Sequence, residues 1–525
     1  MTSYYIGVDV GTQSVRASLL TPCGAEVATN SVPLHVYNPA TDHYEQSCAE
    51  IWSAVCAAVQ EVTHGIPREQ VKGVGFDATC SLVVVDEEGE PLSISRDGDK
   101  TCLMWMDHRA AAETAEINTS ASPVLAYVGG GFSPEQQPPK LLWLKRHMPA
   151  TWSAAAHLFD LPDWLTFRAT GNTCRSVCSV TCKWGYVRSR GGWDTEFLQE
   201  VGLGDLVGLE KLGRTVELPG SRIEGGLNER AAQELGLNPG TCVAVSLIDA
   251  HAGALAMLRY SAELCDSLCV ISGTSTCIMA LCKDKRLVPG VWGPYQDAVL
   301  PGTWLFEGGQ TAAGSALDHL VQSHPAFTTD MTYTSLNTAL AAAHTSLSSP
   351  ALHRLSQHVH IQPDLHGNRS PLALPWLRGM ASGLDLNKDY ANLLNLYLAT
   401  VQGLACGVRH VMERLLEQGL QFSQVVVCGG LADNPLYLHI LATVTKLRVV
   451  VPRAGNMMCR GAALLAQAAH EDAPLDAVLM RGDTDTDSLV YTPMEDLVQF
   501  YEAKYEVYCE MTSDQLKYRK IMQEK

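Results

Sequence analysis

Apolar and polar residues alternate along this chain with two periods, one typical of strands and one typical of helices. Residues 4–20 read YYIGVDVGTQSVRASLL, where two β-rich runs flank a turn of glycine and hydroxyl residues. Residues 268–281, LCVISGTSTCIMAL, repeat this arrangement. Amphipathic stretches such as 49–63 and 393–418 lie between such runs. Strands that alternate with helices predict an α/β fold, and the repeat predicts two similar halves.

The repeat also indicates where the chain divides. We expect the boundary between the halves near residues 255–267, just ahead of the second repeat. The predicted domains are therefore residues 1–260 and 261–480, followed by a helical tail over 481–525. A third glycine turn ends the apolar run QVVVCGG at residue 430 and leads into a helix-like segment.

Composition and charge narrow the class of protein. The 525 residues carry a formal net charge of −18, and we expect no nucleic-acid partner because binding to phosphate backbones requires Lys and Arg. The same charge gives no support for docking on anionic membranes. Residues 1–11 do not read as a signal peptide, and no uncharged apolar run reaches about 18 residues. We therefore expect a cytoplasmic chain without a membrane anchor.

The cysteines fit a reducing compartment. There are 17, an odd number, and none forms a Cys-x-x-Cys pair. Cys174, Cys178 and Cys182 are spaced by four and are predicted to line one face of a helix. A metal site there is the alternative, but no histidine or second cysteine pair lies nearby in the sequence. We interpret the three as packed thiols.

Phosphate binding must come from a device other than the common motifs. The chain has neither the Gly-x-x-x-x-Gly-Lys-Ser/Thr motif of P-loop proteins nor the His-Arg-Asp and Asp-Phe-Gly motifs of protein kinases. Two turns can supply it, because glycine lets the main chain approach a phosphate and free N–H and hydroxyl groups donate to its oxygens. Each turn alone could be an ordinary hairpin, but their matching positions in the two halves favour a pair. Their residues are Gly11, Thr12, Gln13 and Ser14 in the first turn and Gly273, Thr274 and Ser275 in the second.

Two aspartates stand where phosphoryl transfer needs carboxylates. Asp9 precedes the first turn, where Mg²⁺ would sit, since Mg²⁺ binds one or two carboxylates together with phosphate oxygens. Asp249 follows an apolar strand in SLIDAHAGALA, where a buried carboxylate is costly unless it is solvated, paired or catalytic. We predict that Asp249 is the base that accepts a proton from an alcohol, with a helix-capping role as the alternative. The turn at Gly429 and Gly430 is either a nucleoside platform or a plain strand-to-helix connection.

With these residues in place, the chain resembles the FGGY family of carbohydrate kinases. The motifs occur in a specific order over roughly residues 4–480: VDVGTQSVRA, PPKLLWLK, FDLPDWLTFRATG, IDAHAG, ISGTSTC, EGGQTAAGSALDHL and CGGLADNP. The resemblance implies two ribonuclease-H-like domains, as in the superfamily of actin, chaperone ATPases and sugar kinases. It also implies that ATP, Mg²⁺ and a sugar bind in the cleft between them. The sugar would lie on the side of the first domain and the nucleotide on the side of the second.

Four further segments resemble the ribulokinases within that family. They read GFDATCSLVVVD, WMDHRA, SVCSVTCKWGY and PDLHGNRSPLA. The resemblance implies ATP-dependent phosphorylation of D-ribulose to D-ribulose 5-phosphate, with sugar contacts at Asp77, Lys183, Asp249 and Glu307. It implies that Asp9 and Asp249 share the metal. It places Thr12, Gln13, Ser14 and Arg16 near phosphates, Thr274 near the transferred group, and Gly314, Asp318, Gly430 and Asn434 around the nucleoside.

Other readings stay open. L-Ribulose or ribitol could be the acceptor, since one inverted hydroxyl can be read by one side chain. A non-catalytic ATP-binding module of the same fold is a second alternative, because fold does not fix function. The sequence also leaves open whether the chain forms a homodimer.

Overall fold

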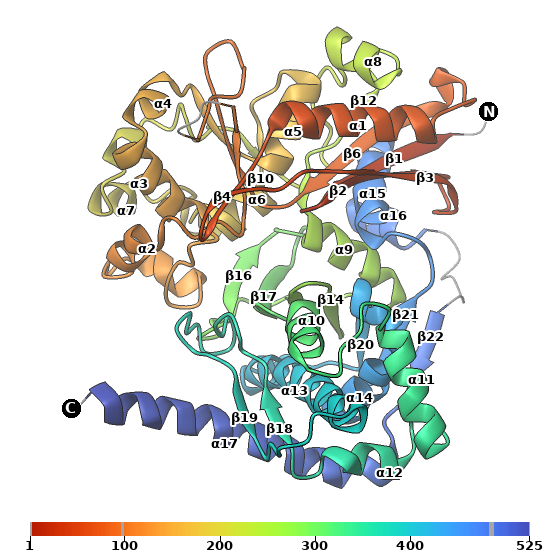
Figure 1. The fold of residues 1–525 in the computed structure, drawn as a ribbon. Helices are drawn as coiled ribbons and strands as arrows, with labels where there is room; N and C mark the ends of the chain where they lie inside the picture. The colour runs from red at the N-terminus through yellow and green to blue at the C-terminus, as the bar shows by residue number, and fades with distance from the viewer. Residues whose placement is uncertain (1–2, 96–98, 482–487, 524–525) are drawn as a thin grey trace.

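The computed structural model describes residues 3–95, 99–481 and 488–523, and it divides into two lobes that each contain a central sheet (Figure 1). The first sheet is formed by residues of the first half, and helix α1 (Cys48–Val62) packs on one face, with its N-terminus capped by the Ser47 side chain. Its strands, in spatial order, are β12 (Cys242–Val243), β6 (Val71–Ala78), β1 (Tyr4–Val10), β2 (Ser14–Leu20) and β3 (Glu26–Pro33), with β13 (Leu247–Ile248) also paired to β6.

An additional small sheet and several helices extend the first lobe. This sheet is formed by β4 (Tyr37–Ala40), β5 (His43–Gln46), β8 (Cys102–Leu103), β7 (Leu82–Val85) and β9 (His157–Asp160). The helices are α2 (Ala111–Ile117), α3 (Gln137–His147), α4 (Pro149–Ala154), α5 (Leu161–Thr170), α6 (Val177–Lys183), α7 (Thr195–Glu200) and α8 (Glu229–Leu235), with the strand pair β10 (Arg175–Ser176) and β11 (Val216–Glu217).

The second lobe repeats the arrangement on a larger sheet. Its strands, in spatial order, are β16 (Trp292–Gln296), β17 (Trp304–Gln310), β15 (Thr276–Cys282), β14 (Ser267–Ser272), β20 (Gln424–Cys428), β21 (Arg448–Pro452) and β22 (Ser488–Tyr491). Further elements of this half are α10 (Gly314–Ser323), α11 (Tyr333–His344), α12 (Pro350–His353), α13 (Tyr390–Glu417), α14 (Pro435–Thr445), α16 (Leu475–Leu479), β18 (His360–Gln362) and β19 (Met380–Ser382).

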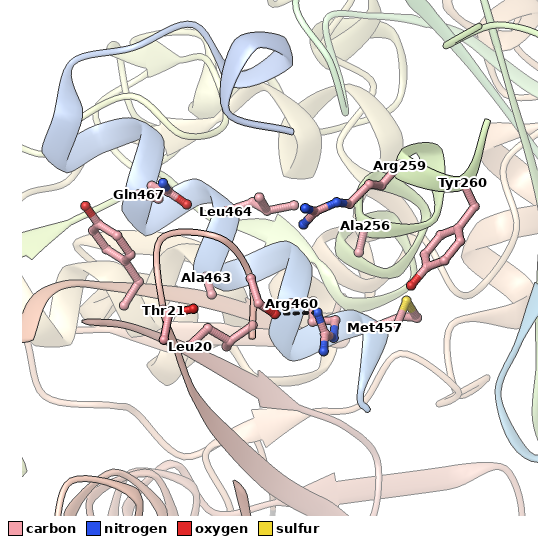
Figure 2. Close-up of a pocket in the computed structure, with 12 residues that line it drawn as sticks. Leu20, Thr21, Ala256, Arg259, Tyr260, Met457, Arg460, Ala463, Leu464 and Gln467 are labelled. Atoms are coloured by element: carbon pink, nitrogen blue, oxygen red, sulfur yellow. Dashed lines mark hydrogen bonds between the residues drawn. The ribbon is translucent and has the colours of Figure 1, made fainter. Parts of the chain in front are cut away.

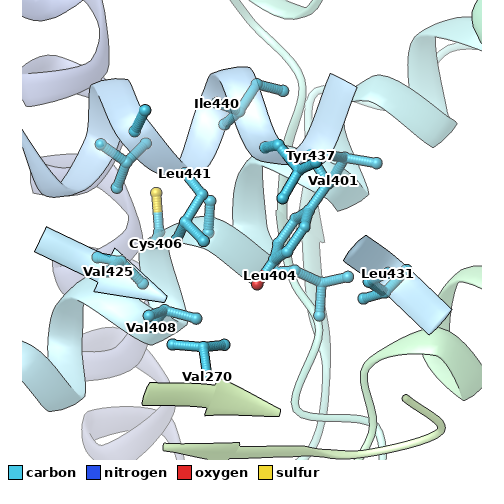
Figure 3. Close-up of a cluster of buried hydrophobic side chains, with 14 of the residues drawn as sticks. Val270, Val401, Leu404, Cys406, Val408, Val425, Leu431, Tyr437, Ile440 and Leu441 are labelled. Carbon is cyan, nitrogen blue, oxygen red and sulfur yellow. The ribbon is translucent and has the colours of Figure 1, made fainter. Parts of the chain in front are cut away.

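The core of the second lobe lies between its sheet and helices α13 and α14. Figure 3 shows Val270 and Val425 of the sheet facing Leu404 of α13 and Tyr437 of α14, all of them fully buried. Among the described residues, α13 is the one helix long and apolar enough to cross a membrane. Its apolar residues are instead mostly inside the lobe, so α13 is a core helix.

The two sheets share one topology. In each, a hairpin of two antiparallel strands carries the glycine turn, and the first strand of that hairpin pairs in parallel with a later strand. The structure thus confirms the predicted α/β fold of two similar, ribonuclease-H-like halves.

Two helices pass between the lobes at their junction. Helix α15 (Met457–Glu471) comes from the second half of the sequence but packs on β1 and β6 of the first sheet and against α9 (Asp249–Met257). The backbone of α15 packs directly on the backbone of the sheet. A Cβ on Gly7 would lie 1.8 Å from the Cys459 carbonyl oxygen, and a Cβ on Gly75 would lie 1.9 Å from the Ala462 carbonyl oxygen. Larger residues would therefore lift α15 off the sheet.

A small cavity of about 30 Å³ remains at this junction (Figure 2). It lies between α15 and the segment that follows α9, and the loop after β2 closes it, where Arg460 donates to the Gly24 carbonyl oxygen at 2.7 Å. This cavity is lined mainly by packing residues such as Ala256, Ala463 and Leu464.

The segment predicted as a helical tail is built into the second lobe. It contributes the edge strand β22 as well as a long helix, α17 (Val498–Gln523). Phe500, Tyr501, Tyr505 and Tyr508 of α17 are buried in the core of that lobe. The segment is therefore a structural part of the second half rather than an appendage.

Candidate active site

Three carboxylates meet where strands of the first sheet end. Asp9 on β1 is paired in register with Asp77 on β6, and Asp77 is in turn paired with Leu247 of β13. Asp249 follows β13 directly and begins helix α9, where its Oδ1 accepts the Ala250 N–H at 2.7 Å. Paired residues on neighbouring strands project from the same face, so the three carboxylates converge.

The clustered negative charge of these three carboxylates favours the binding of a cation. Both carboxylate oxygens of Asp77 are buried without a hydrogen-bond partner among the described residues. Burial, together with the charges of Asp9 and Asp249, raises the pKa of Asp77 well above its usual range. Burial and the Asp9 charge raise the pKa of Asp249 to about 7. A divalent metal would relieve this repulsion, and oxygen donors are the ligands that Mg²⁺ prefers.

Two neighbours orient Asp9. Arg16 Nη1 donates to Asp9 Oδ2 at 3.2 Å, and Asn456, the N-cap of α15, donates from its amide at 3.3 Å. Arg16 is 41% exposed, so its guanidinium can also reach a phosphate. Burial still raises the pKa of Asp9, despite the opposing effects of Arg16 and Asn456.

A buried ion pair joins the two halves beside this cluster. Lys183, at the end of α6, donates from Nζ to Glu307 Oε1 at 3.0 Å, and both side chains are at most 5% exposed. Burial alone would raise the pKa of Glu307, but Lys183 and His251 outweigh it and hold that pKa well below its usual range. The ring of Trp292 lies 4.6 Å from Lys183 Nζ. The structure thus brings together Lys183 and Glu307, two residues far apart in sequence that the resemblance had named separately as sugar contacts.

Two of the three evenly spaced cysteines lie close to His251, a neighbour that their spacing in the sequence did not reveal. Cys178 and Cys182 lie on α6, whereas Cys174 precedes that helix and faces another core. His251 Nδ1 lies 3.0 Å from Cys178 Sγ, and the ligand atoms of Cys178, Cys182 and His251 lie within 4.8 Å of one another. Burial raises the pKa of the Cys178 thiol well above its usual range, which opposes the thiolate that a metal requires.

The first glycine turn is held open toward the cluster. Gly11 N–H donates to Ser14 O at 3.0 Å, and the Thr12 hydroxyl accepts Trp105 Nε1–H at 3.1 Å. Gln46 Nε2 binds the Thr12 carbonyl oxygen at 2.9 Å. The Gln13 side chain is exposed. These contacts fix the main chain of the turn.

The second turn packs on the N-terminus of α10. Gly314 N–H donates to Gly273 O at 3.0 Å, and the N–H groups of Ala313 and Ser315 donate to Thr274 O. A Cβ on Gly314 would lie 2.7 Å from Gly273 O, so glycine is needed for this approach. The Thr274 side chain is exposed at the tip of the turn.

Three of the residues assigned to the nucleoside, Gly314, Asp318 and Asn434, are linked in the second lobe through Tyr333 and Tyr397. Tyr333 OH donates to Asp318 and to the Gly314 carbonyl oxygen, and its ring stacks on Tyr397 at 6.0 Å. Asn434 is only 1% exposed, caps α14, and donates to Tyr397 OH. Asn434 therefore shapes the wall through buried contacts, whereas Gly430 is exposed at the strand end.

Several residues of the site were not foreseen from the sequence. Trp105, Asn456, His251, Tyr333 and Tyr397 each contact a predicted site residue. Asn456 carries a recognisable signal, because Asn immediately before a helical run is typical of an N-cap. The aromatic residues carry none, since their partners are distant in sequence.

Comparison with known proteins places the chain in a family. Residues 4–256 match the N-terminal domain of the FGGY family of carbohydrate kinases and residues 268–470 match its C-terminal domain. The chain is 43% identical to an FGGY carbohydrate kinase domain-containing protein of Danio rerio, covering 99% of both chains. It is 36% identical to a D-ribulokinase of Saccharomyces cerevisiae, covering 89% of this chain and 72% of that one. The chain belongs to the FGGY family of carbohydrate kinases.

Solved structures agree on the fold. A xylulose kinase from Rhodospirillum rubrum superposes with a TM-score of 0.81 at 20% identity, covering 98% of this chain and 99% of that one. The resemblance found in the sequence is thus confirmed, together with the two-domain sugar kinase fold. The chain is a carbohydrate kinase, a phosphotransferase with an alcohol acceptor, and kinases of this family use ATP, generally with a divalent metal.

Proposed function

We propose that this kinase transfers the γ-phosphoryl group of ATP to a hydroxyl of a ketopentose, with D-ribulose as the first candidate and Mg²⁺ as the metal. A D-ribulokinase from yeast and a ribulokinase from Shouchella clausii, the latter 28% identical, are both similar over most of this chain. L-Ribulose and ribitol are the alternative acceptors.

The observation that carries the proposal is the different surroundings of Asp249 and Glu307. Asp249 lies at a strand end among carboxylates, and within the described residues it accepts a hydrogen bond from the backbone N–H of Ala250. Glu307 is already neutralised by Lys183 and faces His251 Nε2 at 3.4 Å. Asp249 can therefore take the proton of the acceptor hydroxyl, whereas Glu307 is held as an anion that orients the sugar.

The other groups divide the remaining work. The carboxylates Asp9, Asp77 and Asp249 would hold the divalent metal, which supplies neutralisation of phosphate charge when bound. Asp77 lies beside Asp9, a position that favours the cation over the sugar contact implied by the resemblance. The turns at Gly11 and Gly273 offer N–H and hydroxyl groups to the phosphates.

The experiment is a panel of pentuloses and pentitols assayed with ATP by coupled ADP release. We expect the largest kcat/KM for D-ribulose, complete dependence on the divalent metal, and little turnover with ATP alone. Turnover that persists with excess chelator would contradict the proposed metal. A larger kcat/KM for L-ribulose or ribitol would replace D-ribulose as the acceptor.

A further inference from the structure

A large cavity opens between the two lobes on the sugar side. Its volume is about 670 Å³, within the range of about 300–1,000 Å³ typical of ligand-binding pockets. One wall is the first-lobe segment 129–135 with helix α2, and the other is the second-lobe loop 366–378. Trp292 lines the cavity and also contacts Lys183, so the cavity adjoins the Lys183–Glu307 pair.

A buried guanidinium lines this cavity. Arg369 lies on the second-lobe loop, and its side chain is 6% exposed. Its Cζ lies 5.6 Å from the Trp292 ring, and its Nη1 lies 3.8 Å from the Sγ of Cys277 on β15. Arg369 thus belongs to the same set of side chains as Lys183 and Glu307, which the sugar must reach.

Arg369 also connects the lobes. Its Nη2 donates to Glu135 of the first lobe, with contacts of 3.2 Å to Oε1 and 3.1 Å to Oε2. His108 of the first lobe also stacks on His366 of the second across the cavity, with ring centroids 5.7 Å apart. The Glu135–Arg369 pair therefore holds the two walls of the sugar side together.

One donor of this guanidinium is unused. Arg369 Nε is buried and has no hydrogen-bond partner within the described parts of the chain. A buried N–H without an acceptor is costly, so such a group indicates a ligand that completes it. The oxygens of a sugar are suitable acceptors, and none of the roles assigned above to site residues uses this donor.

We infer that Arg369 is a sugar-binding residue whose Nε donates to an oxygen of the acceptor, while Glu135 positions Arg369 across the cleft. This inference rests on the proposed function, since it takes the ligand to be a ketopentose. It makes Arg369 a determinant of which sugar is accepted.

The test compares conservative and control variants of Arg369. Arg369→Lys keeps the positive charge that pairs with Glu135 but removes the Nε donor, whereas Arg369→Met removes both. Arg378→Met is the matched control, because Arg378 lines the same cavity but donates to backbone carbonyls of its own loop, those of Pro375 and Leu377. Thermal unfolding of each variant separates loss of folding from loss of the contact.

We expect Arg369→Lys and Arg369→Met to lower kcat/KM for the ketopentose by about 10- to 100-fold, with KM for ATP unchanged. Arg378→Met should stay within about twofold of wild type. Deoxy analogues of the sugar give the sharper readout: one analogue should be penalised in wild type but carry no further penalty in Arg369→Met.

Two outcomes would overturn the inference alone. One is Arg369→Lys with wild-type kcat/KM for a sugar that the wild type phosphorylates. The other is a set of deoxy penalties that is the same in wild type and in Arg369→Met. A wild-type enzyme that phosphorylates no ketopentose would overturn the proposed function together with this inference.

Discussion

The two lobes carry the same hairpin and glycine turn but place different side chains beside it. In the first lobe, the residue two positions before Gly11 is Asp9, and its parallel partner is Asp77. In the second lobe, the residue two positions before Gly273 is Ile271, and its parallel partner is Cys428. The carboxylates that flank the glycine turn are therefore present in one lobe and replaced by uncharged residues in the other.

The two lobes share the backbone of the glycine turn but differ in the side chains beside it, so we expect them to have different chemical roles. The backbone geometry that accepts a phosphate recurs in both lobes, because it depends on glycine and on hairpin topology. The carboxylates occur in the first lobe alone among the matched positions, and there they can hold a cation and accept a proton. The second lobe contributes a neutral turn braced by α10.

The largest expected effect tests whether Asp249 supplies the base. Asp249→Asn keeps the size of the side chain but cannot take a proton, so kcat should fall by about 10²- to 10⁴-fold with ATP affinity little changed. Thermal stability should not decrease, because the substitution removes one charge from a crowded carboxylate cluster.

Glu307→Gln is the control for this assignment. It should mainly raise KM for the sugar, since Glu307 orients the acceptor in our proposal. If Asp249→Asn keeps near-normal kcat while Glu307→Gln abolishes it, the two roles are reversed.

The second prediction tests whether the cation belongs to the first lobe. Asp9→Asn and Asp77→Asn should each weaken Mg²⁺ binding by about 10- to 100-fold, measured by the metal dependence of kcat and of the thermal unfolding temperature. Ser272→Ala, next to the neutral turn of the second lobe, is the matched control and should leave the metal response unchanged. An equal loss of Mg²⁺ affinity in all three variants would contradict the assignment of the cation to the first lobe.

The third prediction concerns the ion pair that crosses between the lobes. Lys183→Met should raise KM for the sugar far more than KM for ATP. It should also lower the free energy of unfolding by about 3–5 kcal/mol, because Glu307 would remain buried without its cation. The double variant with Glu307→Gln should recover much of that stability but not the sugar affinity. Equal effects on both KM values would return Lys183 to a purely structural role.

The smallest expected effect concerns the added helix of the second lobe. Lys504 of α17 donates to the backbone oxygens of Ser356 and Val359, and burial lowers its pKa to about 8. The unfolded chain therefore binds this proton more tightly, so Lys504 adds stability as pH rises from about 8 to its ordinary value of 10.5. Denaturant unfolding of wild type and Lys504→Met should diverge over that range, and parallel curves would contradict the expectation.

The sequence predicts best what depends on neighbouring residues. Both glycine turns and the placement of Asp249 after a strand were foreseen, because hairpins and strand ends leave local patterns. Lys183 and Glu307 were each named as sugar contacts through family resemblance, but their ion pair was not predicted, since 124 positions separate them and no local period links them.

Tertiary partners explain what the sequence did not reveal. The histidine next to Cys178 comes from another helix, and the predicted tail contains a strand whose hydrogen-bond partner is β21. Neither contact can be predicted from the local sequence of either segment. The roles assigned to individual site residues remain predictions for the experiments above.

The seating of α15 on Gly7 and Gly75 has a consequence for how the chain is made on the ribosome. One face of the first sheet is covered by residues that follow the end of β6 by roughly 380 positions. At about 5–20 residues per second, that face would wait roughly 20–75 s for its own helix to emerge. Most of the first lobe is thus synthesised early but is completed only when α15 emerges, and nascent chains that stop before residue 457 should recruit chaperones.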